Sequence, residues 1–65
     1  MDIGLRIGEY LKAHGIKQAF LVQKTGLSAG VVSDICTGTR KGVDTVEYYK
    51  ICKALGVSME TFVEG

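Results

Sequence analysis

The sequence predicts an all-α fold, a compact bundle of five short helices in one domain that spans residues 1–65. The chain contains no proline, and no stretch of it alternates apolar and polar residues as a half-buried strand does. Apolar residues instead recur at helical spacing, and glycine recurs where each such segment should end. With 46% hydrophobic and 23% charged residues, the composition is typical of a globular domain.

The first predicted helix begins after Asp2, a good N-cap, and ends at residues 14–15, His-Gly. It contains Gly4 and Gly8, a GxxxG spacing that in a soluble helix indicates either close backbone approach or simple tolerance of glycine. The residues expected on its inward stripe are Ile3, Ile7, Tyr10 and Leu11.

The next two helices are joined by the short turn T-G-L-S. The first spans about residues 17–24 and ends at Gly26, while Ser28 is expected to cap the second, which Gly38 ends. Their expected inward residues are Leu21, Val22, part of Phe20, Val32, Ile35 and Cys36. The outward face of the second helix is then centred on Gly30, Asp34 and Thr37, with Ala29, Val31 and Ser33 on its flanks.

Two further helices complete the prediction. The sequence DTVE at residues 44–47 is a capping-box-like start, and Gly56 closes this helix. Its inward stripe is Tyr48, Ile51, Cys52 and Leu55. Ser58 is expected to cap a fifth helix that is too short to be stable alone, so Phe62 must dock on the core.

Two short helices joined by a turn that holds glycine match the helix-turn-helix geometry. The string IKQAFLVQKTGLSAGVVSDICTGTRKG, followed by KALGVSMETF, resembles the phage-repressor-like helix-turn-helix family, the group of lambda repressor and Cro. Gln18, Leu21 and Gly26 fall where that family has its glutamine, core leucine and turn glycine. The resemblance covers nearly the whole chain and implies a repressor-like DNA-binding transcriptional regulator that binds double-stranded DNA as a homodimer.

The resemblance also implies which residues meet DNA. The helix after Ser28 would lie in the major groove, with its outward residues facing base edges. These implied base-facing residues are Ser28, Ala29, Gly30, Ser33 and Asp34. The implied phosphate contacts are Gln18, Thr37, Arg40 and Lys41, to which the positive charges of Lys17 and Lys24 add.

Two departures from the family pattern affect these expectations. The outward face lacks the Arg, Gln and Asn side chains whose bidentate contacts each give about 1–3 kcal/mol of base discrimination, so direct readout is expected to be weak. DNA shape would then supply part of the specificity. Cys36 and Leu11 stand where the family often has a Glu and its Arg partner. Because both charges are lost together, we interpret this change as a packing swap.

Charge and cysteine content bound the remaining possibilities. The net charge is +1, but residues 1–42 hold six Lys or Arg against three Asp or Glu, so the positive end is the one suited to a polyanion. No apolar run approaches the ~20 residues of a membrane span, and no signal sequence opens the chain, so we expect a cytoplasmic protein without a membrane segment. Two separated cysteines and one histidine predict buried thiols, no metal site and no cofactor.

The alternative function is a protein-interaction module of the same fold, as an antirepressor or the partner of a toxin would be. The near-neutral face at Ala29, Gly30 and Val31 suits that function, with only weak DNA readout. An enzyme is not expected, because no carboxylate pair, triad or metal cluster stands at a meaningful spacing. The single histidine, His14, falls at a helix end, where an imidazole commonly has a structural role.

Overall fold

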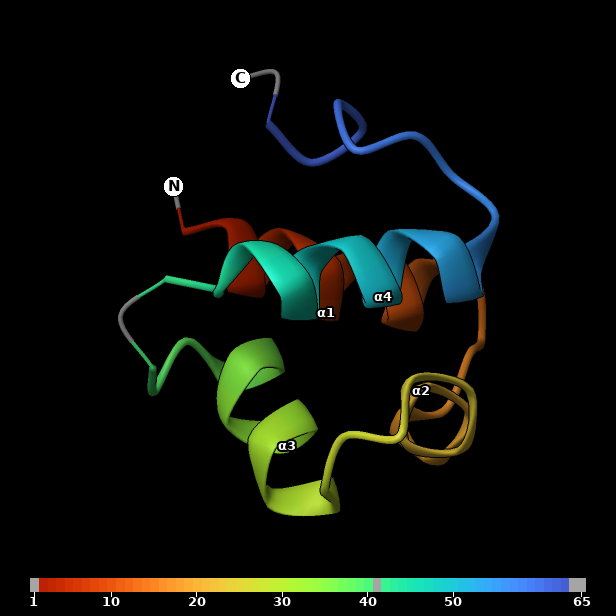
Figure 1. Cartoon of the computed structure of the whole chain (residues 1–65), viewed down its shortest axis with the longest axis vertical. Helices are drawn as coiled ribbons and strands as arrows, with labels where there is room; N and C mark the ends of the chain where they lie inside the picture. Colours follow the sequence, from red (N-terminus) through yellow and green to blue (C-terminus); the bar gives the residue numbers. More distant parts are fainter. Residues whose placement is uncertain (1, 41, 64–65) are drawn as a thin grey trace.

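The structure, a computed structural model, describes residues 2–40 and 42–63. Within these ranges it contains four α-helices: α1 (Ile3–Ala13), α2 (Gln18–Thr25), α3 (Ala29–Thr37) and α4 (Thr45–Leu55). Figure 1 shows α2 and α3 on one side of α1 and α4, and the C-terminal segment on the opposite side. None of these helices is long and apolar enough to cross a membrane.

The predicted fifth helix is wrong. Residues 58–63 form turns, in which the N–H of Thr61 donates to the carbonyl of Ser58 at 3.1 Å and that of Val63 donates to Glu60 at 3.2 Å. Ser58 therefore caps no helix, and its hydroxyl lies 3.3 Å from that of Thr61. A segment this short gains too few helical hydrogen bonds to offset the cost of nucleation.

Side-chain anchors fix the path of the C-terminal segment instead. Phe62 is only 3% exposed, which confirms that it docks on the core. Its ring lies edge-on to Tyr10 at 5.4 Å and to Tyr48 at 6.3 Å, between centroids. Arg6 donates to the carbonyl of Phe62 at 3.1 Å, and the hydroxyl of Tyr48 donates to that of Met59.

The predicted helix ends are otherwise confirmed. The carboxylate of Asp2 accepts from the N–H of Gly4 at 2.7 Å, and the hydroxyl of Ser28 accepts from Val31 at 3.2 Å. The capping box of α4 is formed, and left-handed glycines end α2, α3 and α4. Helix α2 differs, because Lys17 precedes it and gives it no side-chain cap.

Most of the residues that helical spacing predicted are buried in the core, whereas Ile3, Tyr10, Val22 and Leu55 are only partly buried and pack against it. The buried hydrophobic side chains are Ile7, Leu11, Leu21, Val32, Ile35, Cys36, Tyr48, Ile51, Cys52 and Phe62. Both Leu11 and Cys36 are buried, as a packing swap requires.

Burial raises the pKa of the Cys36 and Cys52 thiols, so both stay protonated at neutral pH. Phe20, in contrast, remains 38% exposed.

Helix α1 lies directly against the backbone of α3. A methyl group added at Gly8 would come within 2.5 Å of the carbonyl oxygen of Cys36, and one added at Gly4 would overlap the carbonyl of Ile35. Of the two meanings left open for the GxxxG spacing, the structure therefore shows close backbone approach. Helix α2 in turn packs on both α3 and α4.

An ion pair links the loop after α3 to the first turn of α4. The guanidinium of Arg40 donates to a carboxylate oxygen of Glu47 at 2.9 Å, and the other oxygen of Glu47 accepts from the N–H of Asp44 at 3.2 Å. The hydrogen bond from Arg40 is the largest cause that lowers the pKa of Glu47. One carboxylate thus serves both the start of α4 and the loop before it.

The close contact of α1 with α3 predicts opposite effects for one substitution at two glycines. Gly8→Ala should destabilise the protein by about 1–3 kcal/mol, because the added methyl meets backbone that has no room to yield. Gly30→Ala is the matched control, since nothing lies within 4 Å of its added methyl, and it should stabilise by about 0.4–1 kcal/mol. Urea unfolding of both variants measures the difference, and equal stabilities would contradict the close approach.

The Arg40–Glu47 pair predicts an acid-sensitive contribution to stability. Because the pKa of Glu47 is lowered in the folded state, its contribution is present above the ordinary glutamate pKa of about 4.3 and is lost as pH falls through the folded value. Glu47→Gln should therefore lower the melting temperature near neutral pH, and the deficit should shrink in acid. Arg40→Gln should remove most of the same pH dependence. A deficit that stays constant down to about pH 3 would contradict the assignment.

Candidate nucleic-acid interface

Helices α2 and α3 and the turn between them form a helix-turn-helix. Gly26 adopts the left-handed conformation that ends α2, with φ 77°. The buried hydroxyl of Thr25 donates to the carbonyl of Leu21 at 2.5 Å and accepts from the N–H of Leu27 at 3.2 Å. Thr25 thus ties the turn to α2. No sequence pattern predicted this role for Thr25, although it is the first residue of the turn T-G-L-S.

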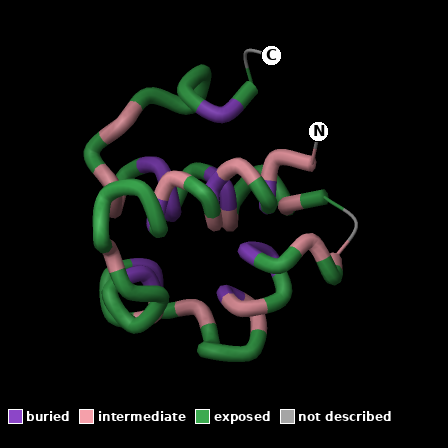
Figure 2. The backbone as a smooth tube through the Cα atoms, turned by 180° about the vertical axis from the view of Figure 1, so that it is seen from behind, coloured by how far each residue is buried: buried purple, intermediate pink, exposed green. Residues whose placement is uncertain are grey.

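The outward face of α3 is uncovered and made of small side chains. Ser28, Ala29, Gly30 and Asp34 are exposed, and Ser33 is half-buried. Figure 2 shows this exposed stretch at the lower edge of the molecule, where α3 begins. No protein atom lies within 4 Å of a methyl group added at Gly30. The predicted base-facing residues therefore lie on one exposed surface, and their small side chains would let a partner come close to the α3 backbone.

The segment after α3 uses most of its polar groups within the protein. The hydroxyl of Thr37 donates to the carbonyl of Ser33 and lies within hydrogen-bond distance of the Thr39 hydroxyl, both at 2.9 Å. The N–H groups of Thr39 and Arg40 donate to the carbonyl of Asp34. The Arg40 guanidinium is held by Glu47, and the predicted phosphate contact Lys41 lies outside the described residues.

The predicted phosphate residues fall into separate places. Gln18 and Thr37 line one hollow of about 480 Å³ between α1, α2 and α3. Lys12 of α1 lines the same hollow, a cation that the sequence analysis missed because only the packing of α1 against α3 brings it there. Lys17 is exposed at the uncapped start of α2. Lys24 instead lines a hollow with side chains of α4.

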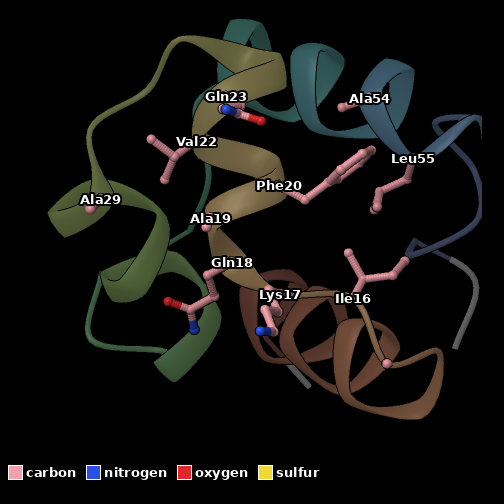
Figure 3. A pocket seen from close by; sticks show the side chains of 11 residues that line it. Ile16, Lys17, Gln18, Ala19, Phe20, Val22, Gln23, Ala29, Ala54 and Leu55 are labelled. Atoms are coloured by element: carbon pink, nitrogen blue, oxygen red, sulfur yellow. The ribbon is translucent and has the colours of Figure 1, made fainter.

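The start of α2 is open to an anion. Without a side-chain cap from Lys17, the first N–H groups of α2 have no side-chain acceptor, and such groups favour negative charge. In Figure 3, Gln18 and Val22 extend toward the side of α2 where Ala29 of α3 lies. Gln18 thus lies on the side of α2 that faces α3, where Thr37 lines the same hollow.

The described part of the chain offers few residues for a metal site or a catalytic site. No group of three or more His, Cys, Asp or Glu residues is placed to hold a metal ion there. His14 stacks on Tyr10 with 4.1 Å between ring centroids, and both free cysteines are buried. The exposed residues of α3 therefore remain the candidate site, and the predicted phosphate residues are divided among the hollow at Thr37, the start of α2 and the hollow beside α4.

Comparison with known families agrees with this geometry. The family described as Cro/C1-type HTH DNA-binding domain matches residues 6–64. No curated protein and no solved structure gives a significant match. The matched region includes α2, the turn, α3 and α4, and it extends into the C-terminal segment that Phe62 anchors. The chain belongs to the Cro/C1-type helix-turn-helix DNA-binding domains.

Proposed function

We propose that the chain is a repressor-like transcriptional regulator, in which α3 enters the major groove of double-stranded DNA. The observation that carries this proposal is the uncovered outward face of α3, from Ser28 to Asp34, on a helix whose opposite side is buried. A helix with one face packed and the other bare fits a groove about as wide as the helix itself.

Affinity in this proposal comes mainly from phosphate contacts. Lys17 and the open N–H groups at the start of α2 are suited to one phosphate, with Gln18 beside them. Lys12 and Thr37 adjoin the hollow that Gln18 lines. Arg40 contributes less than a free cation would, because a phosphate has to share its guanidinium with Glu47.

Specificity in this proposal is only partly direct. Ser33 can bond to several bases, and Asp34 can accept from cytosine but repels phosphate. Because Ala29 and Gly30 let DNA approach the α3 backbone closely, the width and deformability of the groove become part of what is read. Two copies of the chain, each with α3 in one of two successive grooves, would bind a two-fold symmetric site. The exposed side chains of Met59 and Val63 are available for such pairing.

The proposed phosphate contacts predict that DNA affinity falls steeply as salt rises and that each contacting lysine contributes a measurable part of this dependence. Binding to random duplex DNA should weaken as salt rises, and Lys12→Ala with Lys17→Ala should flatten the logarithmic slope by roughly two, one for each lost phosphate contact. Fluorescence anisotropy at several salt concentrations measures both slopes. Lys50→Ala with Lys53→Ala on α4 is the matched control and should leave the slope unchanged. The absence of any binding at low salt would overturn the proposal.

The position of Asp34 predicts a gain on neutralisation. Asp34→Asn should raise the affinity for random duplex DNA severalfold, because it removes a negative charge that faces phosphates. Glu60→Gln, in the exposed C-terminal segment on the opposite side of the fold, should change it little. The same anisotropy assay compares the two variants. Equal affinities for Asp34→Asn and the unchanged chain would mean that α3 presents another face to DNA.

A further inference from the structure

A second surface lies between α2 and α4. It consists of Ile16, Phe20, Ala54 and Leu55, here called the α2–α4 groove. Figure 3 shows Phe20, Leu55 and Ile16 directed toward one another on one side of α2, while Val22 points to the other side. The groove is part of a hollow of about 1040 Å³. Its apolar floor is partly exposed to solvent, since Phe20 remains 38% exposed.

The margin of this groove is strongly basic. Ala54 also lines an adjoining hollow whose other residues are Lys24, Tyr49, Lys50 and Lys53. Among the residues that the structure describes, no acidic side chain lines either hollow. The ammonium of Lys24 lies 5.9 Å from the centroid of the Phe20 ring, and that of Lys53 lies 5.5 Å from the Tyr49 ring. Exposed aromatic rings and cations therefore alternate along one edge.

The charge on this surface contrasts with its sequence context. Residues 43–65 carry a net charge of −2, yet Lys50 and Lys53, their two cations, both lie beside this groove. The acidic residues Asp44 and Glu47 are engaged at the start of α4. Positive charge is thus concentrated where the apolar floor is exposed, which is a pattern suited to a ligand that is both apolar and anionic.

We propose that the α2–α4 groove binds an acidic amphipathic helix of a partner protein. Apolar side chains at i, i+3, i+4 and i+7 of that helix would fill the groove over Phe20 and Leu55. Carboxylates on its flanks would pair with Lys24, Lys50 and Lys53. None of the four groove residues is a proposed base-facing residue, although Ala29 lines the same hollow.

Two other occupants fit the surface less well. A two-fold contact with a second copy would bring the same surface of both copies together, and among the described residues that surface offers Lys24, Lys50 and Lys53 no carboxylate. Nucleic acid would satisfy the lysines, but its phosphates have nothing to fill the apolar floor at Phe20 and Leu55. An acidic amphipathic helix satisfies both the floor and the margin.

A peptide titration tests the proposal. The ¹⁵N-labelled full chain is titrated with a synthetic peptide of about 14 residues, with leucine at i, i+3, i+4 and i+7 and glutamate elsewhere. The amide signals of Phe20, Ala54 and Leu55 should shift. Lys50→Glu and Lys53→Glu should each weaken binding by about threefold to tenfold. Lys12→Glu, the same charge reversal on α1 outside the groove, should leave binding unchanged.

Other outcomes would overturn the inference. These are shifts confined to the outward face of α3, equal binding of a scrambled peptide of the same composition, or equal weakening by Lys12→Glu. The inference also fails if light scattering shows that the chain forms a dimer that a substitution of Phe20 abolishes. It fails likewise if duplex DNA shifts the amide signals of Tyr49, Lys50 and Lys53 while the peptide shifts no signal. The DNA salt-dependence assay tests Lys12 and Lys17 and uses Lys50 and Lys53 only as controls, so failure of the peptide to bind leaves the proposed DNA-binding function standing.

Discussion

The close approach of α1 to the end of α3 is the constraint on which the remaining packing depends. At Gly4 and Gly8 the two backbones meet without side chains between them, at the carbonyls of Ile35 and Cys36. This contact holds the C-terminal half of α3 against α1 and lets Ile7 and Leu11 enter the core. Because a backbone surface repacks less readily than interlocking side chains, the direction of α3 is set with little freedom.

The C-terminal segment shows a different solution to the same need for stability. A domain of 65 residues buries a small core, and the segment after α4 lacks the length to be a stable helix. Phe62 between Tyr10 and Tyr48 covers the core without helical hydrogen bonds. Each edge-on aromatic pair adds about 0.5–1.5 kcal/mol beyond burial of area, and this helps to offset the entropy of ordering the segment.

Most features that depend on near neighbours in the sequence were predicted, the helix after Ser58 being the exception. Of the contacts between distant residues, the docking of Phe62 was predicted, whereas others were not. The caps at Asp2 and Ser28 and the inward stripes follow from local hydrogen bonding and helical spacing. The Arg40–Glu47 pair crosses a loop, and Lys12 lines a hollow with Thr37 only because α1 packs on α3. Helical spacing in the sequence does not predict these contacts, because they join residues of different elements. The exposure of Phe20 depends similarly on how α4 lies beside α2.

Gly30 has a consequence for how such a domain acquires new targets. Its backbone is helical and its surroundings are empty, so the scaffold places no demand on what stands there. Under the proposed function, a methyl group introduced at this position would face DNA and would contact none of the described residues of its own protein. Recognition and folding are therefore separable at this residue, and the domain can change what it reads without rebuilding what holds it together.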